Sequence, residues 1–127
     1  MKISQALREK TLLSFELFPP KTEKGMENLP GTIDHLMKYK PAYISCTYGA
    51  GGGNVGANRE VCQMIKKAGT TPVTHFTVIK NTKEGIKEQL DQYLAEGVDH
   101  MLALRGDIPL GETTTCGDFN YATDLVK

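Results

Sequence analysis

Apolar and polar positions along this chain follow two different periods. Short apolar runs predict strands over residues 12–18, 42–48, 72–79 and 100–104. Apolar residues three and four apart predict helices over residues 23–39, over residues 58–68, and between Thr82 and Gly97. The final FNYATDLVK predicts the start of a fourth helix. Four strand-then-helix units, about 30 residues apart, therefore predict parallel strands joined by crossover helices.

Proline, glycine and capping residues mark the expected ends of these elements. A Pro-Pro pair ends the first strand, because proline has no N–H to donate to a sheet. Asn81 or Thr82 is expected to cap the third helix, and Gly97 lies just past its end. Pro30 and the glycine after it are expected to interrupt the first helix.

Two architectures share this pattern, a doubly wound open sheet and a (βα)8 barrel of which the chain would hold the first four βα units, as a truncated half barrel. The two strand faces help to choose between them. The mainly apolar face is assigned to Phe15, Leu17, Ile44, Cys46, Thr74, Phe76, Val78, Leu102 and Leu104. The opposite face turns polar toward the strand ends, whereas an open parallel sheet covered on both faces should be apolar on both. The barrel therefore fits better.

Composition narrows the class of protein. A chain of 127 residues with 39% hydrophobic residues can bury one core. Its 15 basic and 15 acidic residues leave no polybasic or acidic tract, which argues against nucleic acid or a membrane as a partner. Without a signal-peptide pattern, a cytoplasmic protein is expected. Three widely spaced cysteines without a Cys-x-x-Cys predict reduced thiols and no metal site.

Polar residues come at or just past the carboxyl ends of successive predicted strands. They are Glu16, Thr47, His75, Arg105 and Asp107. Parallel α/β folds gather their sites at this edge, so distant parts of the chain are expected to converge on one mouth. Most of these residues also have a purely structural alternative. Glu16 would pair with a lysine or arginine, and His75 would be a core histidine with its hydrogen bonds satisfied. Arg105 and Asp107 would form an ion pair.

A glycine-rich segment follows the second predicted strand. Gly51, Gly53 and Gly56 satisfy G-x-G-x-x-G, the dinucleotide fingerprint, between a strand and a helix. That fingerprint expects an acid near the end of the next strand, and TPVTHFTVIK contains none. The favoured interpretation is that these glycines let the backbone approach a flat ligand or a phosphate. A nicotinamide-binding Rossmann fold remains the weaker alternative.

Five stretches carry a resemblance in their order and spacing: SFELFPPKTEKG, YISCTYGAGG, VTHFT, MLALRGDIP and FNYATDLV. From about residue 12 to the last residue, the chain resembles the methylenetetrahydrofolate reductase family. The resemblance implies a (βα)8 barrel that holds FAD at its mouth. It also implies reduction of 5,10-methylenetetrahydrofolate to 5-methyltetrahydrofolate with electrons from NAD(P)H. Residues 1–127 would then be the N-terminal portion of a single catalytic domain with no second domain, weakly active or inactive alone.

The resemblance also implies roles for single residues. Glu16 matches the general acid that protonates the folate nitrogen, and Asp107 matches the acid beside the flavin and the pterin. Flavin contacts are implied for Thr47, Tyr48, Ala50, His75, Arg105, Gly106, Asp107 and Tyr121. Leu17 and Gly53 depart mildly from the family pattern. As an alternative function, the half barrel would be a non-catalytic assembly module that pairs with itself, as a homo-oligomer, or with a separate C-terminal half.

Overall fold

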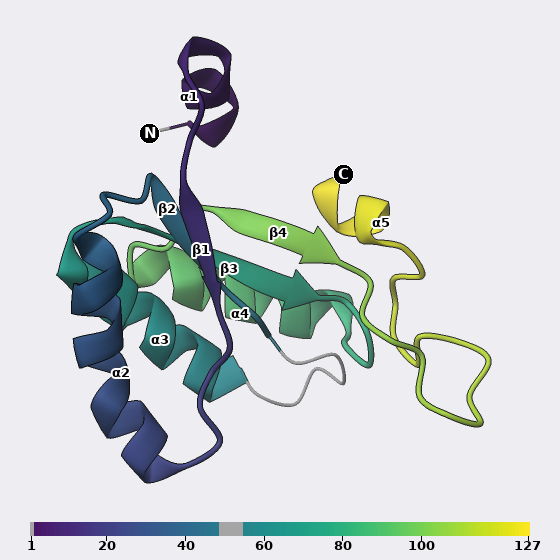
Figure 1. Cartoon of the computed structure of the whole chain (residues 1–127). Coiled ribbons are helices and arrows are strands. Elements are labelled where there is room, and N and C mark those ends of the chain that lie inside the picture. The colour runs from purple at the N-terminus through teal and green to yellow at the C-terminus, as the bar shows by residue number, and fades with distance from the viewer. Residues whose placement is uncertain (1, 49–54) are drawn as a thin grey trace.

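The computed structural model describes residues 2–48 and 55–127, in which helices and strands alternate after a first helix (Figure 1). The elements are α1 (Ile3–Glu9), β1 (Ser14–Leu17), α2 (Glu23–Met37), β2 (Tyr43–Cys46), α3 (Val55–Ala68), β3 (Thr71–Thr77), α4 (Lys83–Ala95), β4 (Met101–Leu104) and α5 (Ala122–Val126). All four predicted strands are confirmed, each shorter than expected. The sequence did not predict α1.

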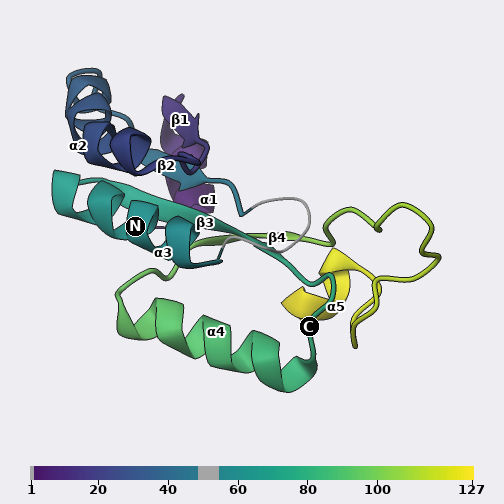
Figure 2. The same cartoon turned by 90° about the horizontal axis from the view of Figure 1, so that it is seen from below.

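The four strands form one parallel sheet in the order β1-β2-β3-β4. A doubly wound sheet reverses its strand order at a switch point, whereas this order is the order of the chain. Figure 2 shows α2, α3 and α4 along one side of the sheet. The predicted α/β class is confirmed, and the arrangement is consistent with part of a barrel, in which crossover helices all lie on the outside.

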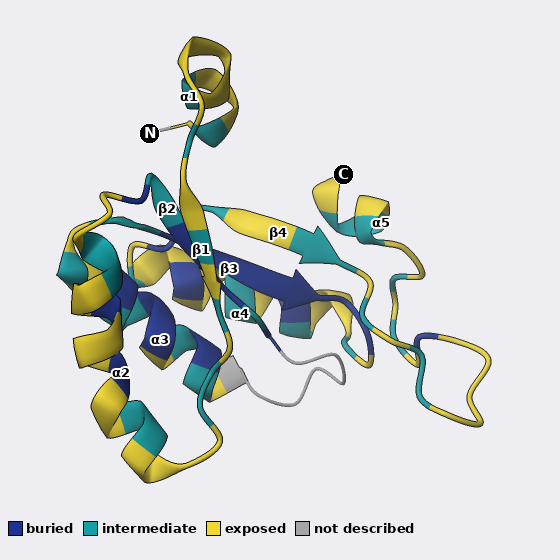
Figure 3. Cartoon of the chain, in the orientation of Figure 1, coloured by how far each residue is buried: buried dark blue, intermediate teal, exposed yellow. Residues whose placement is uncertain are grey.

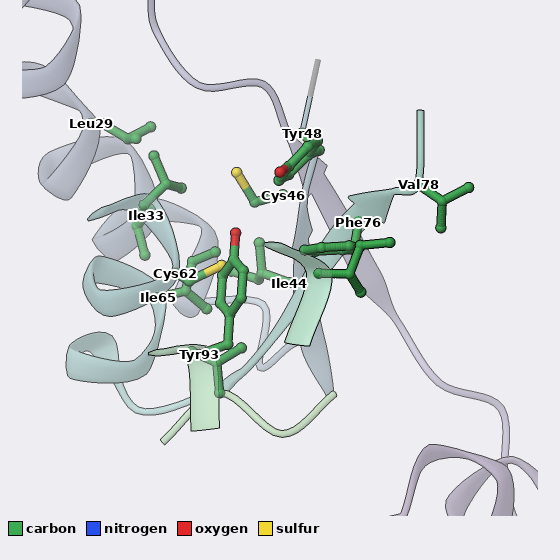
Figure 4. Packing of buried hydrophobic residues seen from close by; sticks show 13 residues of the cluster. Leu29, Ile33, Ile44, Cys46, Tyr48, Cys62, Ile65, Phe76, Val78 and Tyr93 are labelled. Carbon is green, nitrogen blue, oxygen red and sulfur yellow. The ribbon is translucent and has the colours of Figure 1, made fainter. Parts of the chain in front are cut away.

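The core lies between the sheet and these three helices. Figure 3 shows β3 buried after its first residue, while β1 and β4 at the two edges contain only exposed and intermediate residues. The buried side chains in Figure 4 are Leu29, Ile33, Ile44, Cys46, Tyr48, Cys62, Ile65, Phe76, Val78 and Tyr93. The apolar residues of β1 are typical of a buried strand. It is instead an edge strand, and its face away from the helices is open.

Helix α2 corrects one prediction. It runs through Pro30 without a break, although proline removes one helical hydrogen bond. Pro30 is exposed, while Leu29 and Ile33 are buried against the core. Tertiary packing of this apolar face outweighs the local cost. The caps of α4 follow expectation: Thr82 accepts a hydrogen bond from the Gly85 N–H at 3.0 Å.

The assignment of the β4 faces was wrong. Register pairs His75 with Leu102 and Phe76 with Ala103, so Ala103 lies on the helix side of the sheet. Leu102 and Leu104 lie on the open side, where Leu102 is 46% exposed. Alternation shows which residues share a face, but an apolar run such as MLAL carries no polar residue to show which face is covered.

Among the described residues, no helix combines the length and the apolar character that crossing a bilayer requires.

Candidate functional site

A cleft of about 810 Å³ opens at the carboxyl ends of the strands. Its lining comes from the carboxyl-terminal parts of β3 and β4, from residues just after β1, β2 and β4, and from the start of α5. The lining residues are Phe18, Thr47, Tyr48, His75, Thr77, Leu104, Arg105, Gly106, Asp107, Tyr121 and Ala122. The structure thus brings together all the predicted flavin-contact residues except Ala50, which lies outside the described residues, as do Gly51 and Gly53 of the glycine motif.

Glu16 lies in a neighbouring hollow of about 310 Å³ on the open face of the sheet. His75 lines both the hollow and the cleft, and its Nε2 lies 3.5 Å from the Glu16 Oε2. The Glu16 side chain is 50% exposed and that of His75 only 10%. The ionisable partner of Glu16 is therefore a histidine from two strands away, and among the described residues no lysine or arginine forms a salt bridge with Glu16, so that alternative is not observed.

Tyr48 anchors the end of β2 beneath the cleft. Its hydroxyl donates to Gln89 Oε1 of α4 at 2.7 Å, and its ring lies 5.3 Å from the ring of Phe76. Burial raises the pKa of Tyr48 to about 12. The hydroxyl therefore remains a protonated donor throughout the physiological pH range.

The turn after β4 passes close over β3. Gly106 has a φ of +87°, and a Cβ at this position would lie 2.7 Å from Ile79 Cγ2. Arg105 Nε donates to the Gly106 oxygen at 3.1 Å. Arg105 and Asp107, both described, form no salt bridge with each other, so the ion-pair alternative is not observed. Both side chains are exposed and line the cleft.

The long loop after β4 is tied to the turn between β3 and α4. The Lys80 N–H donates to the Thr115 oxygen at 2.7 Å, and the Asp118 N–H donates to the Asn81 oxygen at 3.0 Å. Asp118 Oδ2 in turn accepts from the Lys83 N–H at 2.8 Å. These bonds lead the chain back to the cleft, where Tyr121, which is 64% exposed, lies just before α5.

This sequence is similar to those of known proteins. The family model described as methylenetetrahydrofolate reductase matches residues 2–127. The chain belongs to the methylenetetrahydrofolate reductase family. The 5,10-methylenetetrahydrofolate reductase of Pectobacterium carotovorum subsp. carotovorum is 37% identical over 91% of this chain and 38% of its own length. That of Escherichia coli (strain K12) is 36% identical over 90% of this chain and 38% of its own length.

A plant relative, the probable methylenetetrahydrofolate reductase (NADH) of Oryza sativa subsp. japonica, is 33% identical over 100% of this chain and 23% of its own length. The chain thus spans well under half the length of the curated relatives that it matches. The resemblance carried by the five motifs is confirmed.

The sequence did not predict two residues at or near the cleft of this methylenetetrahydrofolate reductase family chain. Thr77 lines the cleft, is buried, and has a hydroxyl without a hydrogen-bond partner. Asn58 of α3 is fully buried and hydrogen-bonds the end of β2. The one available signal for Asn58 was a polar residue on a helix with a strong apolar face, and Thr77 offered no signal in a Thr-rich strand.

Proposed function

We propose that this chain forms the first four βα units of a (βα)8 barrel that holds FAD at its mouth. In this proposal the complete barrel reduces 5,10-methylenetetrahydrofolate to 5-methyltetrahydrofolate with electrons from NAD(P)H. The main support for this proposal is the cleft, because the predicted flavin-contact residues within the described chain line one continuous hollow at the strand ends. The sequential strand order and the single helix layer support the barrel.

The cleft residues fit a flavin nucleotide. Its volume of about 810 Å³ lies within the usual range for small-molecule sites, roughly 300–1,000 Å³. Arg105 offers a guanidinium suited to phosphate, and Tyr121 an exposed ring suited to a flat partner. The unpartnered Thr77 hydroxyl at the cleft is a polar group that a ligand would satisfy. When bound, FAD supplies hydride transfer between the nicotinamide and the folate.

Two carboxylates take the acid and the binding roles. Glu16 is exposed to solvent on the open face of the sheet, where its carboxyl can reach a folate. There it would protonate the nitrogen whose C–N bond breaks as the five-membered ring opens. The His75 imidazole, 3.5 Å away, restricts the directions in which the Glu16 carboxyl points. Asp107 lines the cleft beside Gly106 and is assigned to hydrogen-bond both the flavin and the pterin.

We also propose that residues 1–127 are the N-terminal portion of one catalytic domain and are weakly active or inactive alone. The outer edges of β1 and β4 pair with no other strand in the described part of the chain. Leu102 is half exposed on the open face, where the opposite wall of a closed barrel would cover it. The span of 38% of the bacterial relatives agrees with a partial domain. Robust steady-state turnover by the purified chain would contradict this proposal.

Titration of FAD into the purified chain, followed by flavin absorbance and fluorescence, tests the flavin site. Saturable binding is expected. Asp107→Ala is expected to weaken it by about tenfold, the loss of one hydrogen bond to a charged group. Glu16→Gln serves as the matched control, since Glu16 lies outside the cleft and its change is expected to leave flavin affinity unaltered. Absence of binding by a folded chain would show that these residues do not hold flavin by themselves.

The open edges favour a second candidate, a non-catalytic assembly module. Two four-stranded halves have enough edges to close an eight-stranded ring, with β4 of each pairing with β1 of the other. Sedimentation would separate the candidates: a stable dimer that unfolds cooperatively favours assembly, whereas a monomer favours one half of a larger catalytic barrel.

A further inference from the structure

The amide of Asn58 is buried, and both of its ends are hydrogen-bonded. Its Nδ2 donates to the main-chain oxygens of Cys46 and Thr47, each at 3.0 Å. Its Oδ1 accepts from Thr74 Oγ1 at 2.7 Å and from the Tyr93 hydroxyl at 2.6 Å. Main-chain oxygens can only accept, so they determine which end of the amide faces β2. One side chain of α3 thus joins β2, β3 and α4.

These bonds lie where β2 leaves the sheet. The ladder between β2 and β3 ends at the pair of Cys46 with Thr74. On the other side, the Thr47 N–H still donates to the Leu17 oxygen of β1 at 2.9 Å. The Asn58 amide therefore supplies donors to the chain at the point where the neighbouring strand stops pairing with it. Thr47 and the next residue, Tyr48, both line the cleft.

We propose that Asn58 is a positioning residue for the cleft: its amide holds the main chain at residues 46–47 so that Thr47 and Tyr48 keep their places in the cleft lining. Asn58 does not itself line the cleft, so it acts through these two residues. The claim that Asn58 holds the main chain at residues 46–47 rests on the hydrogen bonds alone. The ligand part rests on the proposed function, with FAD as the ligand.

The test requires a variant that removes the two donors without leaving buried hydroxyls unpartnered. Thr74→Val with Tyr93→Phe is the control, because it removes both hydroxyl donors to Oδ1, which keeps the Cys62 thiol at 3.7 Å, and leaves Nδ2 on the main-chain oxygens. Adding Asn58→Leu fills a similar volume and removes the donors. The two chains then differ mainly in whether the Cys46 and Thr47 oxygens have their Asn58 donor, and the loss of this donor is the effect to be measured. Asn58→Ser in the natural chain is the second variant, since its hydroxyl can donate to only one of the two oxygens.

Amide hydrogen exchange measured by NMR gives a readout that needs no ligand. The reporter is the Thr47 amide, and the reference is the Val78 amide, which donates to the Leu104 oxygen at 3.1 Å. Adding Asn58→Leu to the control is expected to speed Thr47 exchange relative to Val78 by about tenfold, through local opening. Asn58→Ser is expected to act in the same direction to a smaller extent. Equal changes at both amides would show a purely global effect and overturn the proposal.

Titration of FAD into the same variants tests the ligand part. The variant with Asn58→Leu is expected to bind FAD about tenfold more weakly than its control. Unaltered affinity together with fast Thr47 exchange would overturn the ligand part alone. A natural chain that binds no FAD would contradict the proposed function instead, while the exchange comparison would still decide whether Asn58 holds the end of β2.

Discussion

Replacement of Gly106 by alanine tests how closely the turn after β4 passes over β3. Its φ of +87° lies in a region that costs an L-residue about 1–2 kcal/mol. A Cβ would also lie 2.7 Å from Ile79 Cγ2 and 3.2 Å from Thr77 Cβ, so these neighbours must shift. Forcing a methyl group into a packed site costs roughly another 1–3 kcal/mol. Gly106→Ala is therefore expected to lower the free energy of unfolding by about 2–5 kcal/mol.

Gly111 provides a matched control. It has the same φ of +87°, but a Cβ there would meet no atom within 4 Å. Gly111→Ala should therefore cost only the conformational part, about 1–2 kcal/mol. Urea unfolding followed by far-UV circular dichroism measures both losses, since the chain has no tryptophan to report by fluorescence. The difference between the two variants isolates the steric part.

Equal losses for the two alanine variants would refute the close approach at Gly106. A domain of this size has a free energy of unfolding of about 5–15 kcal/mol. A loss of about 2–5 kcal/mol is therefore measurable, and in a domain at the lower end of this range it leaves the variant partly unfolded. Partial unfolding of Gly106→Ala with a fully folded Gly111→Ala would agree with the steric argument.

Three further predictions concern single side chains. Thr77→Val is expected to leave the free energy of unfolding unchanged or raise it, because its hydroxyl has no partner, while weakening FAD binding; a marked loss of stability would contradict this. Cys116 is exposed, whereas burial raises the pKa of Cys62 to about 12, so a thiol reagent should modify one cysteine in the folded chain and three after unfolding. A hydrogen bond with His100 lowers the Asp99 pKa below its ordinary 3.8. This stabilisation is present above the unfolded pKa and is lost as pH falls through the folded value. Asp99→Asn should remove this contribution, at most about 1 kcal/mol for so exposed a carboxylate, from the fall of the free energy of unfolding at acid pH, as measured by urea titration.

The sequence by itself determined the α/β class and the sheet edge at which the candidate site residues gather. Hydrophobic periods and capping residues are local, so the order of strands and helices and the cap at Thr82 could be predicted. Parallel pairing then places the carboxyl ends of the strands together, and for this reason Thr47, His75 and Asp107 were expected near one another and do line one cleft. The five motifs in their order were sufficient to predict the family.

The tertiary structure alone decided the contacts that join distant segments. Alternation could not show which face of β4 is covered, so Leu102 was placed on the wrong side. The contact between Glu16 and His75 and the network around Asn58 depend on register and on the depth at which helices pack, which no local pattern encodes. Local periodicity therefore determines the elements, whereas which side chains meet across strands and helices is determined by packing of residues far apart in the chain.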